Sequence, residues 1–516
     1  MKKQDTCLMF FSQWTYERPD YASLKERLKE LKKCIQNASS YEELSSAWLE
    51  AKCEIEYMDY QDEIVYIRHL CGIDYEESVK EVEIQNAEEP EVYALRDECN
   101  LLVKNSCYAT MLENEFGKQI FAQVKDHSAA NEADSLKLQS EELQLKMQYR
   151  RLMGSKDRDD DMLFDVFNRL IEIRRELAAS LGYDSYIDLG YHLRCRYNYG
   201  REELSDFRNQ IQKSVTPILC DLKKSGIELS QFSARIQRPE ELITAITEMF
   251  KDLSEESGVY IEEIVQNGLY DLESRANKRP NLWSCCMLPY KKLPFIVGNY
   301  YGNGMETGYA VHEFGHGFAF YTAARTQPLY EFHRSSPAVN EIHSKAMEHF
   351  MYPYLEAFVG DRKKEYVRNH LLQQLENLVY RCAIDEFEHK MYDLPHRTRQ
   401  QFCELWADIS QKYMPWNQIG ADAIREGKCW PHQTHIVETP FYYIEYDIAQ
   451  ISTYEFHLKM QQNHKKAWED YLNLCRAGGS KSYFELLATA NLSNPFAEGT
   501  VERICEKIVE EMGKVL

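Results

Sequence analysis

Apolar residues recur every three or four positions along most of this 516-residue chain, which is the spacing that buries one face of an α-helix. Residues 24–35 carry such a stripe, and residues 160–181 carry another that ends at Gly182, where glycine can close a helix. Ser40 followed by Glu43 has the form of a capping box at the start of a further helix. Strand-like runs are few, so the pattern predicts a mostly α-helical protein.

The segment from Pro294 to Tyr301 is an exception, because it is rich in aromatic and β-branched residues and is followed by Gly302-Asn303-Gly304. This predicts a strand that closes in a turn. At an exposed sheet edge such a strand could pair with an extended peptide through main-chain hydrogen bonds, whereas the alternative is an ordinary core strand. No Gly-Lys-Ser or Gly-Lys-Thr follows the glycines, which excludes a phosphate-binding loop.

The most polar stretch, about residues 125–160, is expected to hold two connections between helices. The chain shows no internal repeat. We expect an N-terminal helical region over residues 1–200 and a second region over residues 201–516 that carries the chemistry. The two regions are expected to pack together as one body.

The second region contains the sequence His312-Glu313-Phe314-Gly315-His316. On an α-helix a four-residue spacing turns by about 400°, so both imidazoles project from one face at a separation that suits one tetrahedral metal. Glu313 then lies beside the metal, where a carboxylate can take the proton of an attacking water. This arrangement is a metallopeptidase signature. We therefore expect His312 and His316 to bind zinc and Glu313 to be the general base.

The residues around this motif are apolar or small, which predicts a buried helix over residues 309–320. Burying two histidines and a glutamate without partners would cost several kcal/mol, so they need a shared reason to be there, and a metal supplies one. Gly315 and Gly317 each cost about 1 kcal/mol of helix propensity relative to alanine. Their presence indicates that another backbone or a ligand approaches the helix closely.

A third metal ligand is needed to complete the site. A metzincin would carry glycine and histidine at positions 319 and 322, where this chain has Ala319 and Thr322. The alternative is a glutamate on a following helix, and we expect it to be Glu341, which leaves room for a loop and an antiparallel return. Glu348 lies about 10 Å further along the same helix, too far to share the ion, but it could orient a histidine ligand.

These residues resemble the thimet oligopeptidase and oligoendopeptidase F family of zinc peptidases, and most closely its bacterial oligoendopeptidase F branch. The family shares the HEFGH motif or a close variant and a Glu-x-x-Ser-x-x-x-Glu helix, which Glu341, Ser344 and Glu348 match. Further similarity is found at residues 16–20, 293–300 and 478–480.

The resemblance implies a large, mostly α-helical ellipsoid with a deep substrate channel and a small β-sheet beside the zinc helix. It also implies an oligoendopeptidase with one zinc ion per chain, which hydrolyses internal bonds of short unstructured peptides by attack of a zinc-bound water. Manganese or cobalt could occupy the same donor set of two nitrogens and one oxygen.

Hydrolysis through a tetrahedral intermediate also needs hydrogen-bond donors aimed at the developing oxyanion. His435 precedes a tyrosine-dense segment, and tyrosines at such density are more often core residues. The resemblance implies that His435 and two tyrosines contact the substrate or the oxyanion. We expect these to be Tyr443 and Tyr446, three apart on one helical face, with Tyr442 as the competing, substrate-binding candidate.

The net charge of −22 argues against nucleic acid as a partner, because no basic stripe replaces counterions. The chain has 15 cysteines, an odd number, and its start lacks the apolar core of a signal peptide, so a reduced, cytoplasmic protein is expected. No apolar run is long enough to span a membrane. We expect short peptides as partners and a monomer or weak homo-oligomer.

Two alternatives stay open. Carboxypeptidases of the Taq type are also helical, of similar length, and carry His-Glu-x-x-His, so stepwise removal of C-terminal residues is one alternative. The other is a peptide-binding protein with an inactive site. The complete set of expected ligands together with Glu313 argues against the second.

Overall fold

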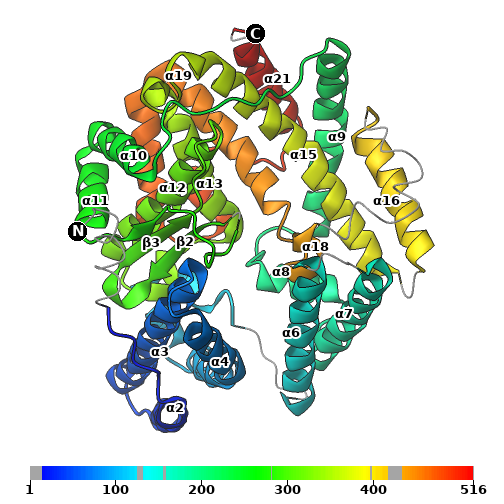
Figure 1. The fold of residues 1–516 in the computed structure, drawn as a ribbon. Coiled ribbons are helices and arrows are strands. Elements are labelled where there is room, and N and C mark those ends of the chain that lie inside the picture. The colour runs from blue at the N-terminus through cyan, green and yellow to red at the C-terminus, as the bar shows by residue number, and fades with distance from the viewer. Residues whose placement is uncertain are drawn as a thin grey trace.

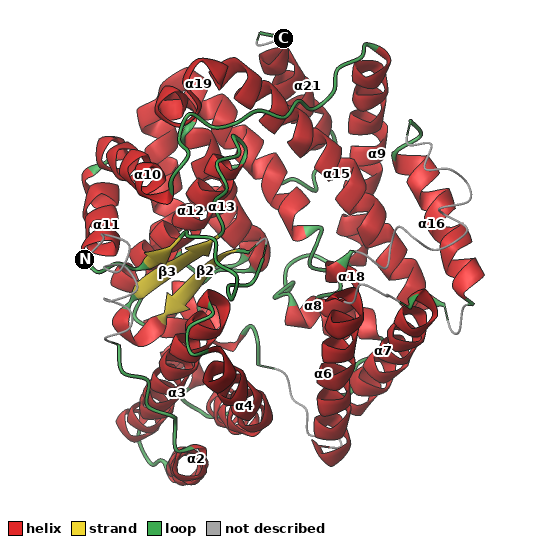
Figure 2. Cartoon of the chain, in the orientation of Figure 1, coloured by secondary structure: helices red, strands yellow, loops and turns green. Residues whose placement is uncertain are grey.

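The computed structural model describes residues 14–124, 132–154, 159–280, 282–394, 398–416 and 433–514. Most of these residues are helical, as the periodicity predicts, and the strands form one small sheet (Figure 2). The N-terminal helices are α2 (Tyr21–Asn37), α3 (Tyr41–Cys71), α4 (Tyr75–Lys104), α5 (Ala109–Phe116), α6 (Glu132–Gly154), α7 (Asp160–Ser180) and α8 (Tyr186–Leu193). There follow α9 (Arg201–Lys224), α10 (Pro239–Leu253), α11 (Glu255–Gln266), β1 (Tyr270–Asp271), β2 (Trp283–Leu288), β3 (Leu293–Gly298), α12 (Glu306–Thr326) and α13 (Pro337–Phe350). The C-terminal elements are α14 (Leu355–Val359), α15 (Lys363–Asp393), α16 (Arg399–Tyr413), α18 (Thr434–Glu438), α19 (Glu445–Ala477), α20 (Tyr483–Thr489) and α21 (Thr500–Gly513).

The three strands are arranged in the order β1-β3-β2. β3 pairs parallel with β1 and antiparallel with β2, in a register that places Trp283 opposite Gly298 and Leu288 opposite Leu293. The strand predicted in the segment 294–301 is β3, and of the two alternatives it is the core strand. It is the central strand, and its run of buried side chains is typical of that position. In the described part of the chain, β1 and β2 are the two edge strands, and β2 is the longer of them.

Helix α12 packs against β2 and β3 on one side and against α13 and α19 on others (Figure 1). A side-chain carbon at Gly315 would lie 2.8 Å from Cβ of Met347 on α13, and one at Gly317 would lie 2.4 Å from the Tyr260 hydroxyl on α11. The expected close approach at both glycines is confirmed. The neighbours are the backbone of α13 and a tyrosine of the core.

Several helix boundaries follow the sequence signals. The apolar stripe at 24–35 is buried at Leu28, Leu31 and Ile35. The Ser40 side chain caps α3 by accepting from the Glu43 amide at 3.2 Å, although the Glu43 carboxylate accepts from Ser39. The predicted helix at 160–181 is α7, which is followed by Gly182 with a φ of +74°.

Within the polar stretch at 125–160, Glu132–Gly154 forms α6, between the two expected connections. Its polar side chains are matched by the neighbouring helix α7: Glu142 accepts from Arg174 at 2.9 Å, and Arg174 is fully buried. Ion pairing between the two helices therefore compensates the polarity of α6. Residues 125–131 and 155–158 lie outside the described segments.

The main hydrophobic core runs from Tyr60 to Met512 and so crosses residue 200, while a second cluster joins α2–α5 to Leu329 and Phe332. Figure 1 shows α2–α4 below the sheet and α10 and α11 beside it, with α6, α7 and α16 on the other side of the molecule. The boundary near residue 200 stays a prediction. No helix in the described segments is both long and apolar enough to cross a bilayer.

The packing at Gly315 leads to a stability prediction. In Gly315→Ala, overpacking against α13 should cost about 1–3 kcal/mol and exceed the gain of about 1 kcal/mol in helix propensity, so the melting temperature should fall. Gly513→Ala is the matched control, because nothing lies within 4 Å of a side-chain carbon there, and it should be neutral or stabilising. Thermal unfolding followed by circular dichroism measures both; equal melting temperatures would contradict the close contact.

Candidate metal centre

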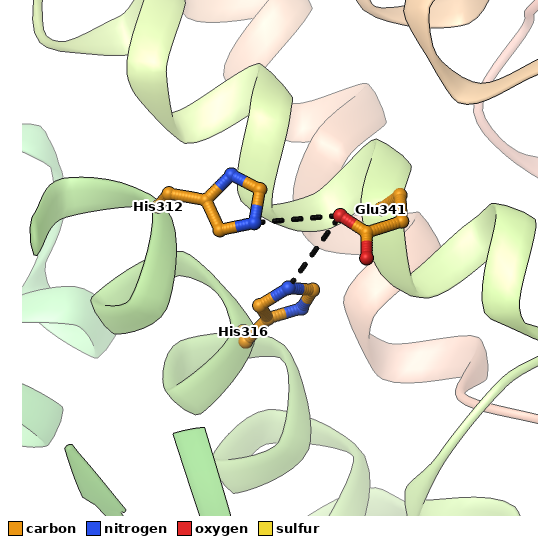
Figure 3. Close-up of side chains that lie close together, drawn as sticks. All are labelled: His312, His316 and Glu341. Carbon is orange, nitrogen blue, oxygen red and sulfur yellow. Dashed lines mark ion pairs between the residues drawn. The ribbon is translucent and has the colours of Figure 1, made fainter. Parts of the chain in front are cut away.

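Three side chains from two helices converge on one point. His312 and His316 project from the same face of α12, with ring centroids 4.8 Å apart, and Glu341 faces them from α13 (Figure 3). Oε2 of Glu341 lies 3.4 Å from Nε2 of His312 and 3.7 Å from Nε2 of His316. Nitrogen and oxygen ligands at zinc-bonding distance in a tetrahedron lie about 3.3 Å apart. The three side chains thus fit a zinc site with three protein ligands.

The position of Glu341 follows from the start of α13. Pro337 is the first residue of this helix, where its fixed φ suits a helix start, and α13 crosses α12 at Gly315 so that Glu341 faces the histidines. Its carboxylate is held on both oxygens: the Ser344 hydroxyl donates to Oε2 at 3.2 Å, and the Tyr442 hydroxyl donates to Oε1 at 3.0 Å. Ser344, one turn further along the same helix, therefore helps to position the Glu341 carboxylate.

Glu348 bridges two histidines behind the site. Its Oε1 lies 2.6 Å from Nδ1 of His312, and its Oε2 lies 2.5 Å from Nε2 of His370 on α15. A proton on Nδ1 of His312 that is donated to this carboxylate leaves the lone pair of Nε2 directed at Glu341. The Tyr352 hydroxyl lies 2.7 Å from the other nitrogen of His370. Neither His370 nor Tyr352 belongs to a motif, so the sequence did not reveal them.

The electrostatics of the site favour a positive charge between the carboxylates. Burial alone would lower the pKa of His312, but its hydrogen bonds with Glu341 and Glu348 raise that pKa to about 10. Burial would raise the pKa of Glu341, yet the hydrogen bond from His312 and the nearby positive charges lower it to about 2. Burial lowers the pKa of His316 to about 4, which leaves its lone pair free. A metal dication supplies the charge that this set requires.

Glu313 is buried on the same helix and is not one of the three converging side chains. Burial raises its pKa to about 7, with further contributions from Glu341 and Glu348, while a backbone hydrogen bond from Cys285 on β2 works in the opposite direction. A carboxyl group whose pKa lies near neutrality can both accept and return a proton.

The converging side chains and Glu313 open onto a cavity of about 770 Å³. Its lining comes from β2, α12 and the segment 329–341. Parts of α3 and α4 and residues 192–198 and 479–486 also contribute. Both of the regions expected from the sequence therefore contribute walls.

The tyrosine segment reaches this cavity differently from the expectation. α19 begins at Glu445, so Tyr443 precedes the helix and shares no helical face with Tyr446. Among the described residues, Tyr442 and Tyr446 line the cavity, whereas Tyr443 does not. The ring of His435 stacks on that of Tyr443 at 4.5 Å and on that of Tyr442 at 6.1 Å. His435 is thus next to the two lining tyrosines without lining the cavity itself.

The inward position of Tyr442 depends on the residue before it. Phe441 has a φ of +63°, which is unusual for a residue with a side chain. Its amide donates to Glu388 at 3.1 Å, and its carbonyl accepts from the buried Arg196. No signal in the sequence indicates this turn.

Two family models match the chain: one described as Peptidase M3 N-terminal domain over residues 11–129, and one described as Peptidase family M3 over residues 252–505. Oligopeptidase PepF from Bacillus subtilis (strain 168) is 24% identical over 269 residues. That alignment covers 51% of this chain and 39% of PepF, so this chain aligns with less than half of that relative.

Solved structures match over nearly the whole chain. A structure of Pz peptidase A with an inhibitor has a TM-score of 0.90 and 28% identity, and the match covers 98% of this chain and 99% of that one. A Bacillus anthracis protein described as an oligoendopeptidase F has a TM-score of 0.87 and 25% identity, with 98% of each chain covered. Trypanosoma cruzi metallocarboxypeptidase 1, with a TM-score of 0.59, 13% identity, and coverage of 94% of this chain and 100% of that chain, shares the fold alone.

The sequence expectation of a peptidase family is confirmed by models that match both parts of the chain. The fold agrees, because it is mostly helical with a small sheet beside the metal-site helix. The convergence of His312, His316 and Glu341 agrees as well. This chain therefore belongs to peptidase family M3.

Proposed function

We propose that this protein is a zinc-dependent oligoendopeptidase that hydrolyses internal bonds of short, unstructured peptides. The observation that carries the proposal is the convergence of His312, His316 and Glu341, with Glu313 beside them, at the wall of one cavity. Family membership supports the same activity.

A zinc ion held by these three side chains would supply a Lewis acid for the scissile carbonyl and would lower the pKa of a water molecule. Glu313 accepts the proton of the attacking water and returns it to the leaving amine. Glu348 keeps the ring of His312 in the orientation and tautomer that binding requires.

Hydrogen-bond donors for the developing oxyanion come from the tyrosine segment. Burial raises the pKa of Tyr442 and Tyr446 well above the ordinary value, so both hydroxyls stay protonated and can donate. Tyr446 lines the cavity and is our first candidate for contact with the oxyanion; Tyr442 contacts substrate beside Glu341. Burial lowers the pKa of His435 to about 4, so its ring is neutral. It stacks on Tyr443 and does not line the cavity, so a direct contact of His435 with the oxyanion stays a prediction.

The size of the cavity limits the size of the substrate. A cavity of about 770 Å³ between two parts of the chain admits an extended peptide segment but excludes a folded domain. The edge strand β2 lies beside Glu313 and offers main-chain groups for pairing with an extended peptide. The cytoplasmic location, the monomeric or weakly associated state and the choice of zinc over manganese or cobalt stay predictions.

The alternative is the release of single C-terminal residues, which the shared fold with a metallocarboxypeptidase keeps open. A mass-spectrometric digest of a mixed peptide library, with and without a chelator and readded zinc, separates the two activities. We expect internal cuts that are confined to short peptides and abolished by chelation. Stepwise shortening from the C-terminus would select the carboxypeptidase, and no cleavage at all would favour a peptide-binding protein.

Glu313→Gln tests the general base. The amide keeps the shape of the side chain but cannot accept a proton, so kcat/KM should fall by about 10²- to 10⁴-fold. Zinc content, measured by mass spectrometry of the metal, should stay at the wild-type value because Glu313 is not one of the three converging side chains. Near-normal turnover would show that another group acts as the base.

Replacement of Glu341 and Glu348 should weaken zinc binding to different extents. Glu341→Ala removes a ligand and should lose the metal on dialysis, whereas Glu348→Gln only loosens the hold on His312 and should weaken affinity by about 10- to 100-fold. Competition with a chelator measures both, and Glu498→Ala, at an exposed position, is the control. Full zinc occupancy in Glu341→Ala would place the third ligand elsewhere.

A further inference from the structure

Two ion pairs neutralise four of the charged side chains that line the cavity. Lys52 forms an ion pair with Glu331, and Arg96 forms one with Asp97 at 2.8 Å. Arg334 and Lys481 also line the cavity, and no carboxylate of the described segments lies within ion-pair distance of either. Lys481 donates to the Thr489 hydroxyl at 3.0 Å. The guanidinium of Arg334 has no carboxylate partner among the described residues, so it is available to a charged group of a ligand.

The guanidinium of Arg334 is directed at the edge strand β2. Its Nε lies 2.8 Å from Sδ of Met287 on β2, and the residue is exposed. Its charge is felt by His316 in the metal centre and by Asp59 and Glu63 on α3. Neither of those two carboxyls forms an ion pair with Arg334; the Asp59 carboxylate accepts from the Tyr93 hydroxyl at 2.9 Å, and that of Glu63 accepts from the Met287 amide.

The spacing of residues along β2 indicates how far Arg334 lies from the reacting bond. Cys285 forms the backbone hydrogen bond to Glu313, and Met287 beside Arg334 is two residues further along β2, which is about 6.8 Å. The amides of Cys285 and Met287 are both occupied, the first by Glu313 and the second by Glu63 at 3.2 Å. A peptide that lies along β2 from Glu313 towards Met287 would therefore reach Arg334 about two residues from the reacting bond.

We propose that Arg334 is a specificity-determining residue that binds a carboxylate of the substrate about two residues from the scissile bond. The carboxylate is either that of an aspartate or glutamate side chain or the C-terminal carboxylate of a short peptide. Arginine binds both through two parallel N–H donors. This inference rests on the proposed peptidase function.

The test is a series of internally quenched peptides in which one glutamate is moved through the positions on either side of the cleaved bond. Each peptide has a glutamine twin, and each is made with a free and with an amidated C-terminus. In the wild-type enzyme we expect kcat/KM to be at least about tenfold higher for glutamate at one position, or for the free C-terminus, and this ratio to shrink at high salt.

Arg334→Gln should bring that ratio close to one, and Arg334→Lys should keep only part of it, because lysine loses the two-donor geometry. Arg151→Gln is the matched control: this arginine is exposed on α6 and does not line the cavity, so the ratio should equal that of the wild type. A ratio that depends on the position of the glutamate indicates that Arg334 binds a side-chain carboxylate. A ratio that is lost on amidation indicates that it binds the C-terminal carboxylate.

Two results would overturn the inference: equal cleavage of all twins by the wild-type enzyme, or an unchanged ratio in Arg334→Gln. A ratio lost only in Arg194→Gln would also overturn it, since Arg194 lies over the ring of Tyr442, 5.5 Å from its centroid, and would place the carboxylate there. If no peptide is cleaved, the proposed function fails, but calorimetric binding of the same twins to the zinc-loaded protein still tests Arg334. Equal affinities for the glutamate and glutamine peptides, and for the free and amidated C-termini, would then exclude carboxylate binding by Arg334.

Discussion

The close contact between α12 and α13 is the constraint on which the metal centre depends. Two histidines one turn apart define a line on one helix, and a third donor must come from elsewhere at about the distance that tetrahedral coordination requires. A glycine at position 315 lets the backbone of α13 come near enough for Glu341 to reach both imidazoles. Any larger residue at the crossing would move the third donor away from the first two.

Hydrogen bonds also hold His312 on the side of its ring that faces away from Glu341. Glu348 joins His312 to His370, and Tyr352 continues the chain of hydrogen bonds into the core formed by α13 and α15. Buried carboxylates of this kind are costly unless they are paired. Here each oxygen of Glu348 has a histidine partner, so the same contacts that satisfy the buried charge also fix the direction of a metal ligand.

Sequence patterns could locate the helices and the three converging side chains because those features are local. Two histidines four apart, a glutamate on the next helix and small residues at the crossing all fall between residues 312 and 341. The neighbours of a strand are not local: the apolar run at 294–298 indicates a strand but not that β1 and β2 flank it. For the same reason the polar composition of α6 does not reveal that Arg174 of α7 pairs with Glu142.

The orientation of the tyrosine side chains in this segment could not be predicted from local sequence patterns. Tyr442 faces the cavity because Phe441 adopts a left-handed backbone, which Arg196 and Glu388 hold from distant parts of the chain. A helical wheel drawn on this segment places Tyr443 beside Tyr446, but the helix starts only at Glu445. His370 gives no signal at all, because its role arises from a single contact with Glu348.

The walls of the cavity come from much more of the chain than the metal centre does. The converging side chains lie within 30 residues of sequence, whereas the ion pair of Lys52 with Glu331 joins wall residues 279 positions apart. The metal centre and the shape of the cavity are therefore set by different parts of the chain. Substitutions in α3, α4 or the segment 479–486 can change the cavity wall while the three converging side chains stay in place.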